Sequence, residues 1–131
     1  MQIVVDASIV LAILLNEPEK SVIIEMTKDI EIVSPASLAW EVGNALSANV
    51  KKNRITHQQA VDAILDYRNI NVRLVDVDLE KAIHISNKYN IYAYDAYVLA
   101  CASNLKIPLL CLDAAMIKLA KLMGVKTLEV V

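Results

Sequence analysis

Short β-branched runs alternate with helix-like patterns along this chain, and that alternation limits the folds available to it. Between the runs, apolar residues recur at helical spacing, as they do at Leu38, Val42 and Leu46. About five strands are expected, at residues 2–5, 30–33, 72–75, 109–112 and 126–130. Strands that alternate with helices favour a parallel sheet covered on both faces. We therefore expect an α/β fold with three layers, α/β/α, in a single domain over residues 1–131.

The composition excludes several other classes of protein. The chain has 131 residues, of which 56% are hydrophobic and 21% charged, and this balance argues against intrinsic disorder. The net charge of -2 argues against a simple basic nucleic-acid binder. The apolar run at residues 9–15 is too short to span a membrane, and no Lys or Arg precedes it as in a signal peptide. We expect a cytoplasmic protein in which Cys101 and Cys111 are core residues.

Two aspartates follow predicted strands directly. Asp6 comes after residues 3–5, and Asp113 comes after residues 109–112. Functional residues of parallel α/β sheets gather at the carboxyl ends of the strands, so both side chains are expected at one edge. Taken singly, each aspartate is better explained as a helix N-cap.

Two further acids lie beside apolar stripes on predicted helices. Glu41 lies inside the helix expected at residues 37–52, where it cannot be an N-cap. It is either a partly exposed residue at the edge of the stripe, a partner of a base distant in sequence, or a functional group. Asp95 can cap or open the helix expected at residues 94–104. An unpaired carboxylate that faces a core is costly. If Asp6, Asp113 and these two acids converge, shifted pKa values or a cation must relieve their repulsion. Carboxylate oxygens suit Mg²⁺ or Mn²⁺.

Four segments around these acids resemble the PIN domain family, and specifically the VapC-type toxins of toxin–antitoxin pairs. They are VVDASIVLAILLNEP, SPASLAWEVGNAL, YDAYVLACA and LLCLDAAMIKLAKLMGVK. The resemblance covers essentially the whole chain and implies a PIN-like fold. It also implies a catalytic, metal-binding quartet formed by Asp6, Glu41, Asp95 and Asp113.

The resemblance extends to three neighbouring positions. Ser8 and Asn44 match residues that would orient the quartet carboxylates from a second shell. Cys111 departs from the family, which commonly has Thr or Ser at this position. A thiol is a poor hydrogen-bond donor, so the placement of metal or substrate there can differ.

The family implies an endoribonuclease that depends on Mg²⁺ or Mn²⁺ and cleaves single-stranded regions of RNA, acting as the toxin of a pair. Its expected partners are the RNA substrate, a cognate antitoxin and a second copy in a homodimer. The cluster Lys51, Lys52 and Arg54 could contact phosphates, although a solvated helix end is the simpler interpretation. The tyrosines of the 92–97 segment could stack bases, although packing is the simpler use.

Two other classes remain as alternatives. The first is a PIN-like module that binds proteins without catalysis, which a complete quartet argues against. The second is another magnesium-dependent phosphate enzyme on a doubly wound sheet. A phosphatase of that type has Asp-x-Asp after its first strand, and here the chain reads Asp6-Ala7-Ser8. A receiver domain needs a Lys after a late strand, where this chain has Asp113.

Overall fold

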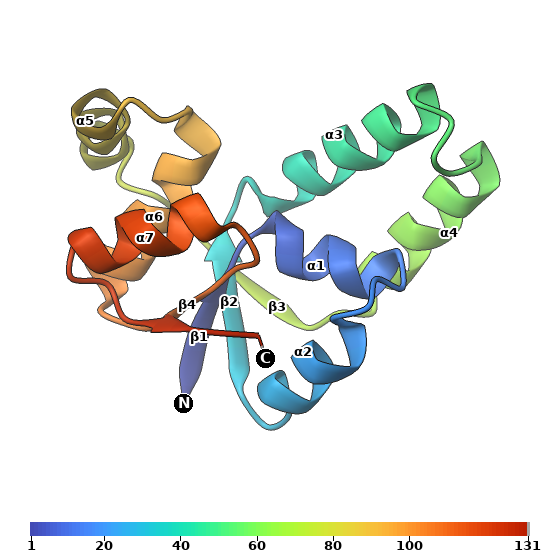
Figure 1. Cartoon of the computed structure of the whole chain (residues 1–131), viewed down its shortest axis with the longest axis horizontal. Coiled ribbons are helices and arrows are strands. Elements are labelled where there is room, and N and C mark those ends of the chain that lie inside the picture. Colours follow the sequence, from blue (N-terminus) through green and yellow to red (C-terminus); the bar gives the residue numbers. More distant parts are fainter. Residues whose placement is uncertain (131) are drawn as a thin grey trace.

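A parallel five-stranded sheet forms the centre of the computed structural model, which describes residues 1–130 (Figure 1). The strand order is β3-β2-β1-β4-β5, and every neighbouring pair is parallel. The strands are β1 (Gln2–Val5), β2 (Glu31–Pro35), β3 (Val72–Val75), β4 (Leu109–Leu110) and β5 (Thr127–Leu128). The expected class of fold is therefore confirmed.

Helices cover both faces of this sheet, as Figure 1 shows. On one face lie α1 (Ala7–Leu14), α2 (Lys20–Thr27), α3 (Leu38–Lys51) and α4 (His57–Tyr67). On the other lie α5 (Leu79–Tyr89), α6 (Ala93–Leu105) and α7 (Ala114–Leu122). The three layers of the α/β/α architecture follow from this division.

The side chains of the central strand divide the interior into two cores. Ile3 and Val5 point into the core formed with α1 to α4, whereas Val4 points into the core formed with α5 to α7. All three are buried. Successive strand residues point to opposite faces, so a strand covered on both sides must be apolar throughout. This is why residues 3–5 form an unbroken apolar run.

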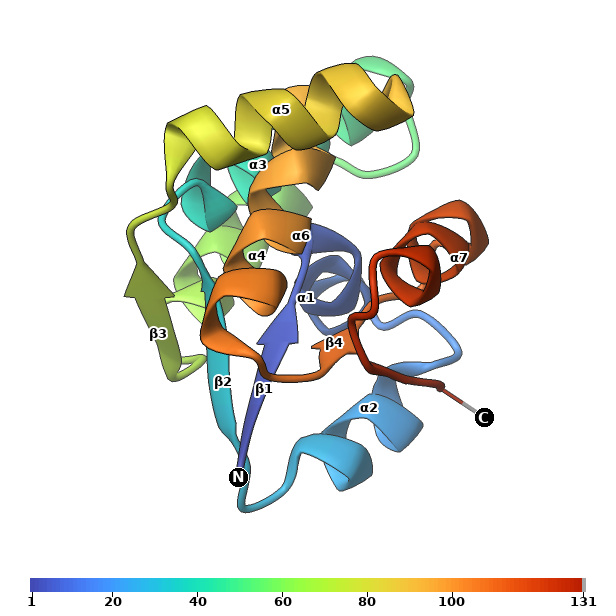
Figure 2. The ribbon, with the colours of Figure 1, turned by 90° about the vertical axis from the view of Figure 1, so that its left-hand side faces the viewer.

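The ends of the strands differ in part from the sequence-based expectation. The strand predicted at residues 30–33 extends through Ser34 and Pro35, which belong to β2 and pair in register with Leu74 and Val75 of β3. Conversely, β4 ends at Leu110 rather than at residue 112. Figure 2 shows β1, β2 and β3 running in the same direction. Their carboxyl ends therefore lie at one edge of the sheet.

Helical spacing predicts an apolar face at Val61, Ile64 and Leu65 and another at Leu79, Ala82, Ile83 and Ser86, and the structure buries only part of each. Val61 and Leu65 of α4 are exposed, because α4 packs on α3 and α1 and buries Ala63 instead. Leu79 and Ile83 of α5 are also exposed, because α5 packs on α6 through Ala82 and Ile85.

None of the helices in residues 1–130 combines the length and the apolarity that crossing a bilayer requires.

Candidate metal centre

Asp6 and Asp113 lie at the carboxyl ends of two paired strands. Asp6 directly follows β1 and is the N-cap of α1, while Asp113 follows β4 and is the N-cap of α7. Asp113 Oδ1 accepts a hydrogen bond from the backbone N–H of Ala115 at 2.8 Å. Since β1 and β4 are parallel neighbours, both acids lie at the same edge of the sheet. The capping role that each was assigned singly is confirmed.

The Ser8 hydroxyl connects these two strand ends. It donates to Asp6 Oδ1 at 2.6 Å, and it accepts from the backbone N–H of Leu112 at 3.1 Å. The same Asp6 oxygen also accepts from the N–H of Ile9 at 3.4 Å. Ser8 therefore holds the Asp6 carboxylate in place and ties the start of α1 to the segment that leads into Asp113.

Glu41 and Asp95 approach this edge from two helices on opposite faces of the sheet. Glu41 lies in the first turn of α3, and Asp95 lies in the first turn of α6, whose N-cap is Tyr92. Asp95 therefore opens its helix and does not cap it. Both side chains are half-buried. The N-terminal turn of a helix favours negative charge, which offsets part of the cost of burying these groups.

The electrostatic coupling of the four acids shows that the fold brings them together. The pKa of Asp6 is raised to about 6, chiefly by burial and in part by the charge of Asp95, while the hydrogen bonds from Ser8 and Ile9 lower it. The pKa of Glu41 is raised to about 7, chiefly by burial and in part by the charges of Asp6 and Asp95. The pKa of Asp95 is raised by burial and by the charge of Asp113. These couplings link all four carboxylates in one cluster.

No basic side chain neutralises this cluster within residues 1–130. The two ion pairs there join Arg73 to Glu31 at 3.5 Å and Lys121 to Glu129 at 3.2 Å. In that part of the chain, the side-chain conformations do not bring three or more His, Cys, Asp or Glu groups into a geometry that could hold a metal ion. One oxygen of each aspartate, Oδ1, is engaged in hydrogen bonds instead: that of Asp6 with the Ser8 hydroxyl and the N–H of Ile9, and that of Asp113 with the N–H of Ala115.

The chemistry of this donor set nevertheless fits a hard divalent cation. Four coupled carboxylates without a counter-charge repel one another, and an ion bound between them relieves that repulsion. Their oxygens are the ligand type that Mg²⁺ and Mn²⁺ take in proteins. The residues that would hold such an ion are Asp6, Glu41, Asp95 and Asp113.

Cys111 lies in the field of the same acids. Its side chain is buried, and its Sγ donates to the backbone oxygen of Asp113 at 3.8 Å. Burial, followed by the charge of Asp6, raises the pKa of the thiol to about 12. The thiol therefore stays protonated at neutral pH, whereas metal ligation requires the thiolate.

The structure shows no contact for Asn44 that would orient a carboxylate. Its side chain is exposed, and within residues 1–130 it makes no hydrogen bond to Glu41. Its proposed supporting role therefore remains a prediction from the family resemblance.

Ser34 is a supporting residue that the sequence did not single out. It is almost fully buried, and its hydroxyl donates to the backbone oxygen of Val5 at 2.8 Å. This bond ties β2 to the residue just before Asp6. The Ser34-Pro35 pair is typical of a strand end, so nothing in its sequence context indicated a buried, bonded hydroxyl.

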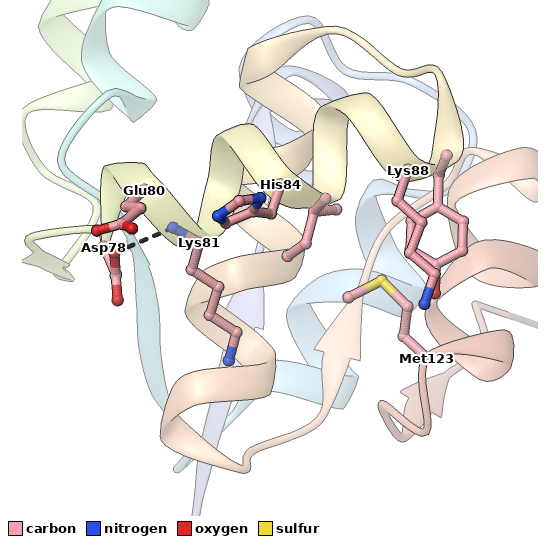
Figure 3. Close-up of a pocket in the computed structure, with 8 residues that line it drawn as sticks. Asp78, Glu80, Lys81, His84, Lys88 and Met123 are labelled. Atoms are coloured by element: carbon pink, nitrogen blue, oxygen red, sulfur yellow. Dashed lines mark hydrogen bonds between the residues drawn. The ribbon is translucent and has the colours of Figure 1, made fainter.

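A cavity of about 450 Å³ lies along α5, where Lys81, His84 and Lys88 line one side and Met123 the other (Figure 3). None of the four acids borders it. This cavity is therefore separate from the acidic centre.

The fold is thus a three-layer α/β/α domain whose acidic residues gather at the carboxyl edge of a parallel sheet, where ligand sites of such domains lie. The sequence profile of the PIN domain matches residues 3–122, and the chain belongs to the PIN domain family. A search of curated proteins found no match.

Solved structures share the fold at low sequence identity. PAE2754 from Pyrobaculum aerophilum has a TM-score of 0.72 at 18% identity, covering 97% of this chain and 92% of that one. VapBC2 from Rickettsia felis, bound to a DNA fragment from their promoter, has a TM-score of 0.66 at 15% identity, covering 98% of both chains. VapBC-1 from nontypeable Haemophilus influenzae has a TM-score of 0.63 at 15% identity, also covering 98% of both.

Proposed function

We propose that this protein is a divalent-metal-dependent endoribonuclease that cleaves single-stranded regions of RNA and acts as the toxin of a toxin–antitoxin pair. The observation that carries the proposal is the gathering of four acids at one edge of the sheet, where Asp95 is coupled to Asp6, Glu41 and Asp113 and no ion pair within residues 1–130 involves any of the four. Membership of the PIN domain family supports it. The similarity in fold to the VapBC proteins of R. felis and H. influenzae supports the toxin assignment.

Each acid has a defined place in the proposed chemistry. Asp6, Glu41, Asp95 and Asp113 together hold the cation. When bound, Mg²⁺ or Mn²⁺ lowers the pKa of a coordinated water and neutralises charge on the phosphate. A carboxylate from α6 or α7, Asp95 or Asp113, accepts the proton of the attacking water.

Neighbouring groups support these acids without taking part in bond cleavage. Ser8 and Ser34 fix the side chain of Asp6 and the backbone before it. The Cys111 thiol, which stays protonated, is not needed as a nucleophile. Both histidines are exposed on helix surfaces, as expected from their polar surroundings, and we assign them no catalytic role.

The surface offers apolar side chains for protein partners. Tyr92 is 88% exposed and Tyr94 is 42% exposed, as expected for the 92–97 segment. The sequence offers a second apolar stretch, residues 11–14, as exposed surface, but Ala12 and Leu14 are buried in the core. We propose that this protein forms a homodimer in the cytoplasm and binds an antitoxin. An arginine of the antitoxin can pair with the carboxylates and take the place of the cation.

Metal-dependent cleavage is the test of this function. Purified protein should cleave single-stranded RNA with Mg²⁺ or Mn²⁺ and lose that activity in EDTA, and added metal should restore it. Glu41→Gln should remove activity, whereas Glu25→Gln, an exposed acid on α2, should retain it. Equal cleavage in EDTA would refute the metal mechanism. A folded, metal-loaded protein without activity on any RNA would favour a non-catalytic interaction module instead.

A further inference from the structure

A second cavity lies beside the acidic centre, at the carboxyl ends of β2 and β3. Its volume is about 400 Å³. It is lined by two residues that follow β2, three that follow β3 and one from α6: Ala36, Ser37, Asp76, Val77, Leu79 and Tyr97. None of these residues belongs to the proposed metal quartet.

The position of this cavity relates it to the acids. The backbone N–H of Glu41 bonds to the oxygen of Ser37 at 3.1 Å, so the two residues lie one helical turn apart. Tyr97 lies on α6, which packs on both β1 and β2; it follows Asp95 by two residues, so the two side chains leave different sides of the helix. Strand β2 is the neighbour of β1, which carries Asp6 at its end, and adjacent strands lie about 4.8 Å apart. The cavity therefore lies at the same edge of the sheet as the acids, one helical turn from Glu41.

The walls of the cavity suit a flat aromatic ligand. Val77 and Leu79 provide an apolar surface, and Leu79 is 61% exposed on the outer side. Tyr97 adds an aromatic ring, which Tyr94 supports edge-on with ring centroids 5.9 Å apart and planes at 85°. Unstacked RNA bases bind to proteins by stacking on aromatic side chains of this kind.

Ser37 provides a polar group that the fold itself does not use. Its hydroxyl oxygen is the one buried side-chain polar atom in residues 1–130 without a hydrogen-bond partner. Ser37 stands at the N-cap of α3 but makes no capping bond. A buried, unpaired hydroxyl is unusual in native proteins and calls for an explanation. Rotation about χ1 would present this hydroxyl to a ligand without breaking any existing hydrogen bond.

Asp76 provides the second polar group, and its chemistry distinguishes between bases. It is exposed and belongs to neither ion pair of the described residues. A carboxylate only accepts hydrogen bonds. Guanine presents two adjacent N–H donors on its Watson–Crick edge, matching two carboxylate oxygens. Uracil presents one N–H between two carbonyl oxygens, which a carboxylate repels.

We propose that this cavity binds an RNA base flanking the cleavage site and prefers guanine to uracil, with Asp76 as the discriminating residue and Tyr97 as the stacking surface. This inference rests on the proposed ribonuclease function. It adds a specificity site that is separate from the metal centre.

The test compares binding of guanosine and uridine 5′-monophosphate to the full chain by calorimetry at fixed pH and salt. The two probes share the same phosphate and ribose, so their affinity ratio isolates the base. Wild-type protein should bind the guanine nucleotide roughly tenfold more tightly. Asp76→Asn should bring the two affinities close together. The matched control Asp66→Asn, an exposed acid on α4, should leave the ratio unchanged.

Tyr97 variants test the stacking surface separately. Tyr97→Phe should retain binding of both nucleotides, and Tyr97→Leu should weaken both while the melting temperature shows that the protein is folded. Equal binding of the two nucleotides by wild-type protein would overturn the proposal. The proposal would also be overturned if Asp76→Asn had the same ratio of guanine to uracil nucleotide affinity as the wild type.

Cleavage assays separate this proposal from the proposed function. Metal-dependent cleavage that is indifferent to the flanking base and to Asp76→Asn would refute the base site and leave the ribonuclease intact. Selective guanine binding by a protein that cleaves no RNA would refute the ribonuclease and leave the base site.

Discussion

At the scale of single residues, the Ser8 hydroxyl illustrates how the acidic centre is held. It is both donor and acceptor, bonded to the Asp6 carboxylate and to the backbone N–H of Leu112. A carboxylate within a cluster of like charges would otherwise turn away from its neighbours. The two bonds to Ser8 keep Asp6 at the junction of β1 and β4.

Ser8→Ala should lower the free energy of unfolding by about 1–2 kcal/mol, because it leaves a part-buried N–H without its partner. It should also raise the pKa of Asp6 further, since the bond from Ser8 lowers that pKa. Urea denaturation measures the first effect, and NMR titration of the Asp6 carboxyl carbon measures the second. Ser8→Thr, which retains the hydroxyl, should show much smaller changes. An unchanged stability for Ser8→Ala would contradict the role assigned to this contact.

Asp6→Asn should abolish metal-dependent cleavage without destabilising the fold. The pKa of Asp6 rises from 3.8 to about 6 on folding, so the ionised side chain opposes folding. This penalty is absent below pH 4 and complete above about pH 6, with a size of about 3 kcal/mol. Asparagine caps a helix as well as aspartate does, so the α1 cap is kept.

Calorimetry in EDTA at several pH values checks this expectation. The melting temperature of Asp6→Asn should match that of the wild type near pH 4 and exceed it above pH 6. A variant that is less stable than the wild type at pH 8 would show instead that Asp6 acts mainly as a cap.

At the scale of elements, several helices begin at a capping side chain, and only some of these caps belong to the acidic centre. Asp113 caps α7 and Asp78 caps α5, each by accepting backbone N–H groups. Thr56 and Gln59 form the expected capping box at the start of α4. The same local chemistry therefore serves both structural and proposed catalytic positions.

Alanine substitution at two of these caps should separate stability from activity. Asp113→Ala and Asp78→Ala should each cost about 1 kcal/mol of stability, since each removes a helix cap. Only Asp113→Ala should also remove ribonuclease activity. Asp113→Asn should keep the stability and still lose the activity. If Asp78→Ala lost activity to the same extent, the loss would reflect the helix and not the carboxylate.

At the scale of the whole molecule, the apolar residues that the fold leaves exposed favour self-association. Tyr92 is the most exposed of the large apolar side chains, and Leu79 and Ile83 are exposed on α5. An exposed apolar surface of this kind commonly marks a protein interface. We place the interface of the proposed homodimer around Tyr92, whose side chain lines neither the acidic centre nor the cavity proposed to bind a base.

Light scattering at micromolar concentration should give the mass of a dimer. Tyr92→Asp should give a monomer with unchanged circular dichroism, because it places a charge in the apolar interface. Leu122→Asp alters an exposed apolar residue on α7 and should remain dimeric. A strictly monomeric wild-type protein would rule out the homodimer. A dimeric Tyr92→Asp variant would show that the dimer interface does not include Tyr92.

Much of this architecture follows from local sequence patterns. The apolar run at residues 3–5 predicts a central strand, because a strand buried on both faces has no polar position. The positions of Asp6 and Asp113 after their strands then predict that both lie at one edge. Gly124 ends the helix before it with a φ of 79°, as expected for a glycine at this position.

Other features were decided only by the tertiary structure. Ser34 and Pro35 join a strand because β3 pairs with them, and Val61 and Leu65 are exposed because α4 packs through Ala63. Periodicity tells which residues share a face of a helix but not which face meets the core. The approach of Glu41 and Asp95 to Asp6 is likewise set by how the helices pack on the sheet. It depends on the placement of α3 and α6 over opposite faces of the sheet, and residues so distant in sequence come together only when both cores are packed.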